Sequence, residues 1–343
     1  MADRIVLNTI SYHGHGAIEN IVPELTARGY KKAFVCSDPD LIKFGVTGKI
    51  TALLDAASFP YAVYSEIKPN PTIQNVQDGV AAFKAAEADC IVTIGGGSSM
   101  DCAKAAGARI VKPHQSIQQM KGLLKVHKRL PLLIAIPTTA GTGSEATPNS
   151  IVAVPEKELK VGIVNGEMIP DYVILDAQMI KNLPVKIAAA TGVDALAHAI
   201  ECFTSKKATP FSNMFALESL DLIMNNIEEA CLNKDAMEAK NNMLIAAFYA
   251  GVAISASGTT AVHALSYPLG GKYHIPHGVS NAILFAHVMK MNKEACTLQL
   301  AEICDAINPS KFVESMDAKA DYVISQIEDI VKFTEIPTDL YRF

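Results

Sequence analysis

Four histidines and one aspartate could hold a divalent metal ion. Asp194 and His198 stand four residues apart in an Ala-rich segment that is otherwise strongly helical. This spacing puts both side chains on one helical face, one turn apart, where they can chelate one cation. Further along, His263, His274 and His277 add three imidazoles, and His277 directly precedes an expected helix. One carboxylate and three imidazoles suit Fe(II) or Zn(II) and leave room for a substrate oxygen.

A glycine-rich turn at residues 95–101 indicates phosphate binding. It directly follows an apolar run that ends at Ile94 and leads into a helical run over residues 102–110. Such a turn lets the backbone approach a pyrophosphate closely, and N–H groups at the helix start favour its negative charge. The turn is neither Gly-x-Gly-x-x-Gly nor a Walker A motif, so its position between strand and helix supports the prediction.

Two further loops offer groups for a dinucleotide. The turn at residues 137–145 follows another apolar strand and contains four hydroxyls and two glycines. Those hydroxyls can donate hydrogen bonds to phosphate or ribose oxygens. Asp38 lies just past an expected strand, where a carboxylate can accept hydrogen bonds from the adenosine ribose. A 2′-phosphate there would be repelled, so Asp38 favours NAD over NADP.

The elements that position these residues change in character along the chain. In the first half, short β-rich runs alternate with helical stretches, which predicts crossover units and a mainly parallel sheet. The predicted strands are 32–36, 61–64, 90–94 and 132–137, and the predicted helices between them are 19–28, 43–57 and 73–87. From about Lys181 onward, Ala-, Leu- and Met-rich stretches predict helices at 184–204, 210–232, 237–257, 260–269, 278–289, 294–307 and 318–334.

These patterns predict two domains, in line with a length of 343 residues. Residues 1–180 are expected to form a Rossmann-like α/β domain with a parallel sheet that binds the dinucleotide. Residues 181–343 are expected to form an all-α domain that binds metal and substrate.

Composition excludes several classes of protein. A formal charge of −5, from 30 Lys and Arg against 35 Asp and Glu, argues against a nucleic-acid partner. No apolar stretch reaches the ~18 residues of a membrane helix, and no secretory leader begins the chain. Seven cysteines are widely spread without a Cys-x-x-Cys pair, which favours free thiols in a reducing compartment. We therefore expect a cytoplasmic protein without a membrane partner.

The sequence resembles the iron-containing alcohol dehydrogenase family nearly end to end, in the group III type that includes lactaldehyde reductases and propanediol dehydrogenases. The stretches that carry the resemblance are 68–72, 95–98 with Asp101 and Lys104, 137–145, 191–201, and 276–279 with 281–282. The resemblance implies that Asp194, His198, His263 and His277 are the metal ligands, and that His274 is a bystander or a partner of a ligand.

The same resemblance implies NAD as cofactor, in a cleft between the α/β and helical domains. It also implies a homodimer or larger assembly. The residues expected at the dinucleotide are Asp38, Asn70, Gly96, Gly97, Ser98, Asp101, Thr138, Thr139, Thr142 and Lys160.

Two departures from the family pattern affect the expected chemistry. Tyr267 stands where many members carry a further histidine, four residues after the third ligand. A tyrosine can donate a proton, but its unperturbed pKa of about 10 makes it a poorer relay at neutral pH. The chain also stops where relatives continue through further helices, so we expect it to be truncated at its C-terminus.

The function expected is a metal-dependent NAD(H) oxidoreductase that interconverts small alcohols or diols with aldehydes or ketones. Tyr267 and His277 are the expected catalytic residues. One alternative keeps the fold but uses zinc and a polyol such as glycerol. A lyase of the dehydroquinate synthase type would need Lys and Arg converging on an anionic substrate, and the ligand motifs are poor in both. A truncated, inactive homologue would bind nucleotide without transferring hydride.

Overall fold

Six strands of the first half form one sheet in which every pairing is parallel, in the order β1-β9-β6-β4-β2-β3. The structure is a computed structural model that describes residues 5–157, 159–273 and 275–336. The six strands are β1 Ile10–His13, β2 Ala33–Cys36, β3 Tyr61–Tyr64, β4 Cys90–Gly95, β6 Leu132–Pro137 and β9 Tyr172–Leu175. The predicted parallel sheet is confirmed, with β1 and β9 as strands that the sequence patterns had not indicated.

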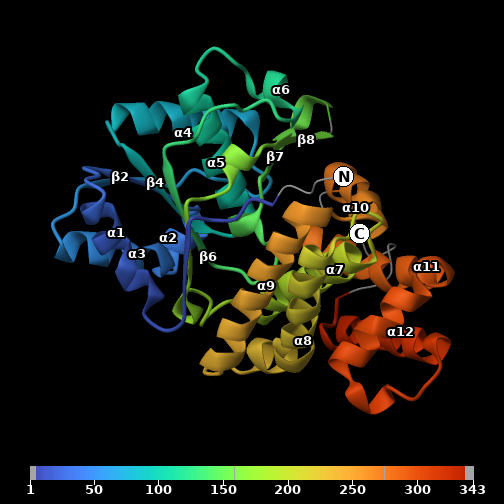
Figure 1. The fold of residues 1–343 in the computed structure, drawn as a ribbon. Helices are drawn as coiled ribbons and strands as arrows, with labels where there is room; N and C mark the ends of the chain where they lie inside the picture. The colour runs from blue at the N-terminus through green and yellow to red at the C-terminus, as the bar shows by residue number, and fades with distance from the viewer. Residues whose placement is uncertain (1–4, 158, 274, 337–343) are drawn as a thin grey trace. The chain divides into compact units, whose positions relative to one another are not determined.

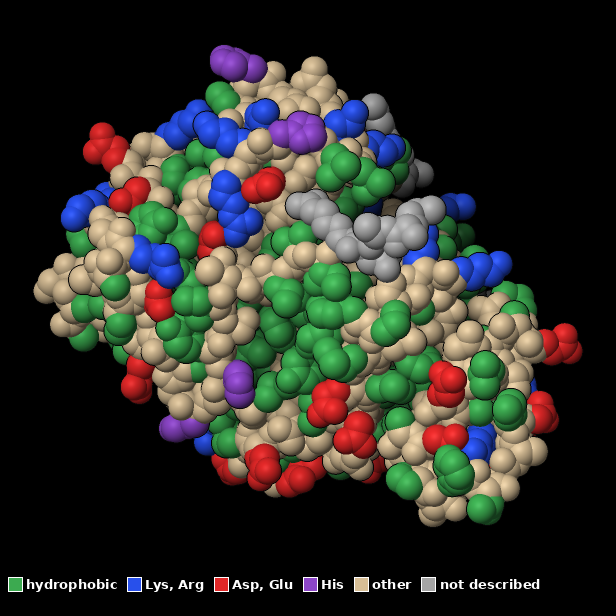
Figure 2. All heavy atoms as spheres, viewed as in Figure 1, with side chains coloured by type: hydrophobic (Ala, Val, Ile, Leu, Met, Phe, Trp, Pro, Cys, Tyr) green, Lys and Arg blue, Asp and Glu red, His purple; other side chains and the backbone are tan. Residues whose placement is uncertain are grey.

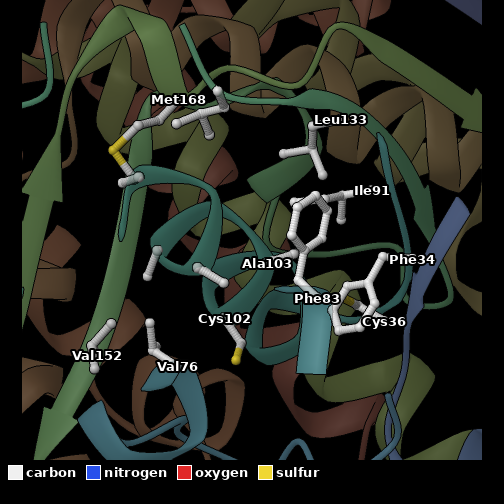
Figure 3. Packing of buried hydrophobic residues seen from close by; sticks show 14 of the residues in the cluster. Phe34, Cys36, Val76, Phe83, Ile91, Cys102, Ala103, Leu133, Val152 and Met168 are labelled. Carbon is white, nitrogen blue, oxygen red and sulfur yellow. The ribbon is translucent and has the colours of Figure 1, made fainter. Parts of the chain in front are cut away.

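The central strands are apolar throughout because helices cover both faces of the sheet. Consecutive residues of one strand point to opposite faces of the sheet. Phe34 of β2 packs in one hydrophobic cluster, and Val35 packs in the other. In Figure 3, Phe34, Ile91 and Leu133 point from the sheet toward Phe83 and Ala103 of the helices on one face. The helices of this unit, seen around the sheet in Figure 1, are α1 Ile21–Ala27, α2 Pro39–Lys43, α3 Val46–Ala56, α4 Ile73–Ala85, α5 Gly97–Val111 and α6 Ile117–Met120.

A small second sheet joins β5 (Gly122–Leu123), β8 (Leu159–Val164) and β7 (Asn149–Val154). β7 and β8 form an antiparallel pair, whereas β5 runs parallel to β8. The sequence patterns did not indicate this sheet. Burial alternates along β7, as expected for a strand with only one face covered.

The second half is helical, as predicted. Its helices are α7 Val185–Thr204, α8 Pro210–Leu232, α9 Met237–Ser257, α10 Ala261–Lys272, α11 His277–Ile307 and α12 Met316–Phe333. The two helices predicted at 278–289 and 294–307 are the two parts of α11, which a kink at Cys296, with φ −134° and ψ 24°, separates. The helix predicted over 43–57 is confirmed as α3, which begins only at Val46 because Gly45, at φ +71°, separates it from the end of α2.

The contacts divide the chain into two compact units. The α/β unit comprises Val6–Thr138 and Ser144–Ile180, and the helical unit comprises Thr139–Gly143 together with the chain from Lys181 onward. No single helix among the described residues is long and apolar enough to cross a membrane, and only α9 and α10, bent by 104° at their junction, reach that length and hydropathy as a pair.

Charges of both signs share the surface. On the face shown in Figure 2, Lys and Arg side chains are interspersed with Asp and Glu side chains. Acidic side chains also gather along the lower edge of this view. All seven cysteines are buried and free, as the sequence predicted. Burial raises the pKa of the Cys102 thiol to about 12, so this side chain is a poor nucleophile.

Candidate metal centre and dinucleotide site

Three candidate dinucleotide residues follow neighbouring strands of the large sheet. Asp38 follows β2, Gly96 follows β4, and Thr138 follows β6. Since the three strands are adjacent and parallel, their carboxyl ends meet at one edge of the sheet. From β2 the chain continues to β3, which lies on one side of β2, and then to β4, which lies on the other side of β2. Open α/β sheets bind ligands at such a reversal of strand order.

The glycine-rich turn closes tightly at this edge. An added Cβ on Gly95 would lie 2.2 Å from Oγ of Ser99, so a side chain at this position would displace the first turn of α5. Gly96 is the N-cap of α5 and makes no side-chain capping bond. The first N–H groups of this helix can therefore bind an anion such as a pyrophosphate.

Three predicted site residues come together beside this turn. The backbone N–H of Asn70 donates to Oγ of Ser98 at 3.2 Å, and Nζ of Lys160 donates to Oδ1 of Asn70 at 2.8 Å. Asn70 adopts a left-handed backbone conformation with φ +54°. This chain of contacts joins the β8 hairpin to the first turn of α5 through one exposed loop.

The remaining candidates have different surroundings. Asp38 caps α2, and its Oδ1 accepts from the backbone N–H of Leu41 at 2.9 Å. The backbone N–H of Thr138 donates to the carbonyl of Gly95 at 3.0 Å, which ties the second turn to the first. Thr139 and Thr142 belong to the segment that groups with the helical unit.

Buried Lys104, part of the motif that carries the family resemblance, organises the loop after the second turn. Its ammonium group donates to the carbonyls of Ser144 (2.5 Å), Thr147 (2.7 Å) and Asn149 (2.9 Å). Oδ1 of Asp101 accepts from Oγ of Ser144 at 3.0 Å. Burial lowers the pKa of Lys104 to about 8 and raises that of Asp101 to about 6. Both residues thus fix residues 144–149 against α5.

Glu145, in the same loop, makes the stability of the protein depend on pH. Burial raises the pKa of this carboxyl group from its usual 4.5 to about 7. The folded state therefore holds this proton more tightly than the unfolded state, and the resulting stability is lost as the pH rises through 7. Glutamine carries no charge, so Glu145→Gln does not lose this stability. We expect the difference in free energy of unfolding, variant minus unsubstituted protein, to increase by about 2 to 3 kcal/mol between about pH 5 and pH 8.

Urea denaturation at a series of pH values measures this difference. Glu156→Gln, which changes an exposed carboxyl group, is the matched control and should show no such trend. A Glu145→Gln difference that stays constant across the pH range would contradict the expectation.

In the helical unit, four predicted ligands from three helices converge. Asp194 and His198 lie one turn apart on α7, His263 lies on α10, and His277 is the first residue of α11. Oδ1 of Asp194 is 3.9 Å from Nε2 of His198, 3.5 Å from that of His263 and 3.6 Å from that of His277. All four ligand atoms lie within 4.8 Å of one another.

Close contact between α11 and α7 brings His277 to this cluster. An added Cβ on Gly278 would lie 2.2 Å from the carbonyl oxygen of Ala190, so any side chain there would separate the two helices. Gly278 thus allows the first turn of α11 to approach the helix that carries Asp194.

The arrangement fits a divalent transition metal ion. Metal bonds of about 2.1 Å in a tetrahedral site place ligand atoms about 3.4 Å apart, which is close to the distances of Oδ1 of Asp194 from Nε2 of His263 and His277. Although burial opposes the charged form, the surrounding imidazoles hold the pKa of Asp194 well below its usual range. Burial lowers the pKa of His198 to about 4, so this imidazole is neutral at pH 7 and can offer a lone pair.

Glu201 orients one of the ligands. It lies two turns after Asp194 on α7, is fully buried, and its Oε2 contacts Nδ1 of His263. Its Oε1 accepts from the backbone N–H of Val262 at 2.7 Å and from the hydroxyl of Thr260 at 2.7 Å. A proton held on Nδ1 leaves Nε2 of His263 free to face the cluster. Burial opposes the charged form of His263, but its bonds to Asp194 and Glu201 raise its pKa to about 9, so a metal ion that binds at Nε2 would displace the second proton of this ring.

Glu201→Gln should weaken metal binding by about 10- to 100-fold, the usual effect of changing a residue that orients a metal ligand. The amide keeps the shape of the carboxylate, but it can turn an N–H group toward His263 and favour the tautomer with a proton on Nε2. Competition with a chelator for Zn²⁺ measures the change. The exposed Glu218→Gln on α8 is the control, and equal affinity of both variants would disprove the orienting role.

Tyr267 lies at the border of the cluster. Its ring is parallel to that of His277, with an angle of 7° between planes and 5.9 Å between centroids, and the residue is 44% exposed. His274, expected to be a bystander, lies outside the described residues.

Comparison with known proteins identifies the family. A family model described as iron-containing alcohol dehydrogenase matches residues 8–177, and a model of the C-terminal part of the Fe-containing alcohol dehydrogenase family matches residues 188–342. The chain belongs to the iron-containing alcohol dehydrogenase family.

Individual relatives agree with this result. The chain is 37% identical over 296 residues to the lactaldehyde reductase of Escherichia coli (strain K12), covering 86% of this chain and 77% of the relative. A crystal structure of 1,3-propanediol oxidoreductase has a TM-score of 0.95 and 32% identity, covering 100% of this chain and 89% of that one. The sulfoacetaldehyde reductase of Bifidobacterium kashiwanohense, solved with NAD⁺, has a TM-score of 0.87 and 28% identity, covering 99% and 88%.

These comparisons confirm the predicted fold class, an α/β part with a parallel sheet followed by a helical part. They also confirm the predicted enzyme class. The protein is an alcohol dehydrogenase of a family that uses NAD and iron.

Proposed function

We propose that this protein interconverts small alcohols or diols with the corresponding aldehydes or ketones, with a metal ion held by Asp194, His198, His263 and His277. The observation that carries the proposal is the convergence of one carboxylate and three imidazoles from three helices within 4.8 Å. Three of these side chains are nearly fully buried, whereas that of His277 is 33% exposed. The cluster therefore has one side from which a substrate can approach.

A bound divalent metal supplies Lewis acidity that lowers the pKa of an alcohol oxygen, and NAD supplies the hydride acceptor. Asp194 offsets part of the positive charge at the centre. Glu201 holds the proton of His263 on Nδ1, so that Nε2 is directed at the metal. His277 and Tyr267 form the side of the centre that faces the substrate. The hydroxyl group of Tyr267 can donate a hydrogen bond to a substrate oxygen.

We propose that the dinucleotide lies at the carboxyl edge of the large sheet, with its pyrophosphate at the start of α5. Asp38 would bind the adenosine ribose and favour NAD over NADP. The other residues proposed at this site are Asn70, Gly96, Gly97, Ser98, Asp101, Thr138, Thr139, Thr142 and Lys160.

We further propose a cytoplasmic homodimer or larger assembly of the chain, with a domain boundary near residue 180. Seven buried free thiols are typical of a reducing compartment. The grouping of contacts, which separates Ser144–Ile180 from the chain that follows, supports the boundary.

Oxidation of NADH by the anaerobically purified protein tests the function. The panel contains short aldehydes, hydroxyaldehydes and ketones, each assayed with Fe(II) or Zn(II). We expect turnover that a chelator removes and that one metal restores. Restoration by zinc alone, with a preference for dihydroxyacetone over monohydroxy substrates, would favour a polyol dehydrogenase. Binding of NADH without reduction of any substrate would indicate an inactive homologue.

A further inference from the structure

We propose that Asn281 is a fifth residue of the metal centre, a positioning residue whose side-chain amide holds Asp194 and closes one side of the ligand cluster. Asn281 lies one helical turn after His277 on α11 and is fully buried. The inference rests on the proposed function of the four ligands, and it assigns a role to a side chain that is not itself one of them.

One nitrogen atom of this amide contacts three of the four ligands. Nδ2 of Asn281 donates to Oδ1 of Asp194 at 2.6 Å, and it lies 3.2 Å from Nε2 of His263 and 3.4 Å from Nε2 of His277. An amide nitrogen carries only two hydrogens, so it cannot serve three acceptors equally. The short bond to the charged carboxylate is the strongest of the three. Asn281 therefore fixes the orientation of Asp194 first.

The three contacts also place the amide over one face of the cluster, the triangle formed by Asp194, His263 and His277. A substrate oxygen cannot enter through that face while the amide covers it. The side chains of Asp194 and His263 are 2% exposed and that of His198 is 7% exposed, against 33% for His277. An oxygen from solvent therefore reaches the centre past His277, on the faces that this ligand shares with His198.

The amide oxygen of Asn281 shows that packing alone does not explain why an asparagine occupies this position. Oδ1 of Asn281 is buried and makes no hydrogen bond to any of the described residues. A buried acceptor without a partner is unfavourable, and an apolar side chain of similar size would avoid the problem. The amide nitrogen, through its contact with Asp194, is thus the part of the side chain that the site uses.

Two variants separate the hydrogen bond from the covered face. Asn281→Leu removes the donor but still fills the space, whereas Asn281→Ala removes both. We expect each to weaken Zn²⁺ binding by about 10- to 100-fold in chelator competition, measured without NAD or substrate. With Co²⁺ in the site, Asn281→Ala should also show weaker visible absorption, because a water molecule can enter through the opened face and raise the coordination number. Asn281→Leu should keep the absorption of the unsubstituted protein.

Ser280→Ala is the matched control. Ser280 is the neighbouring residue on α11, it is fully buried, and its hydroxyl has no partner among the described residues. This variant should bind both metals as the unsubstituted protein does, and circular dichroism checks that all three variants are folded. If Asn281→Leu does not fold, Asn281→Ala alone tests both expectations.

The outcomes distinguish this inference from the proposed function. Zn²⁺ affinity and Co²⁺ spectra that match those of Ser280→Ala in both Asn281 variants would overturn the role of Asn281 and leave the metal centre intact. Failure of the unsubstituted protein to bind either metal would overturn both proposals.

Discussion

Replacing His263 with alanine is expected to abolish metal-dependent turnover. His263 contacts two buried carboxylates, Asp194 through Nε2 and Glu201 through Nδ1, and is 2% exposed. A bound metal stabilises the charge that develops on the substrate oxygen by several kcal/mol, so its loss should lower kcat/KM by about 1,000-fold or more. Steady-state kinetics measure the loss of turnover, and metal analysis of the purified variant measures the loss of bound metal.

The substitution also leaves the buried carboxylate of Glu201 without its imidazole partner, which can destabilise the fold. The double variant His263→Ala/Glu201→Gln removes that uncompensated charge and should be equally inactive while folding more readily. His114→Ala, at an exposed position of the α/β unit, controls for the general loss of a histidine. Full turnover of His263→Ala in metal-free buffer would disprove the assignment.

Replacing Lys104 with methionine should destabilise the α/β unit by about 3–5 kcal/mol, the typical effect of removing one partner of a buried charge. The side chain is completely buried, and its ammonium donates to three backbone carbonyls of residues 144–149. Methionine fills a similar volume but supplies no donor, so these carbonyls and the carboxyl group of Asp101 lose their cationic partner. The free energy of unfolding from urea denaturation reports the loss.

The exposed Lys84→Met on α4 is the matched control and should change stability by less than about 0.5 kcal/mol. Equal stability of the two variants would mean that water or rearranged backbone groups replace the ammonium. Lys104 holds the loop that follows the turn proposed to bind the dinucleotide, and it does not belong to the metal centre. Lys104→Met should therefore also raise the KM for NADH more than it lowers kcat.

The long apolar strands were predictable from the sequence, whereas β1 and β9 were not. The long apolar runs at residues 90–94 and 132–137 predicted β4 and β6, because only a strand covered by helices on both faces is apolar throughout. β1 lies at the edge of the sheet and alternates between half-buried and exposed residues, so it resembles a loop in composition. β9 is apolar but has four residues, too few for periodicity to separate a strand from a helix.

The candidate site was predictable where its residues lie close in sequence. The i, i+4 spacing indicated that Asp194 and His198 share a helical face, whereas the choice of His263 and His277 over His274 came from the family resemblance. Which ligand each partner contacts could not be predicted from the sequence. Glu201 contacts a residue 62 positions away, and Asn281 contacts one 87 positions away, so only the packing of α7, α10 and α11 brings them together.

The pairing of β1 with β9 constrains how the protein can be made. Ile10 is in register with Tyr172, so one edge of the six-stranded sheet joins the beginning of the α/β unit to its last strand. During synthesis on the ribosome, β1 emerges early, but it cannot pair with β9 until nearly the whole α/β unit has been translated. Contacts so distant in sequence form late and slow folding. We therefore expect nascent chains that end before residue 172 to expose an unpaired strand and to depend on chaperones.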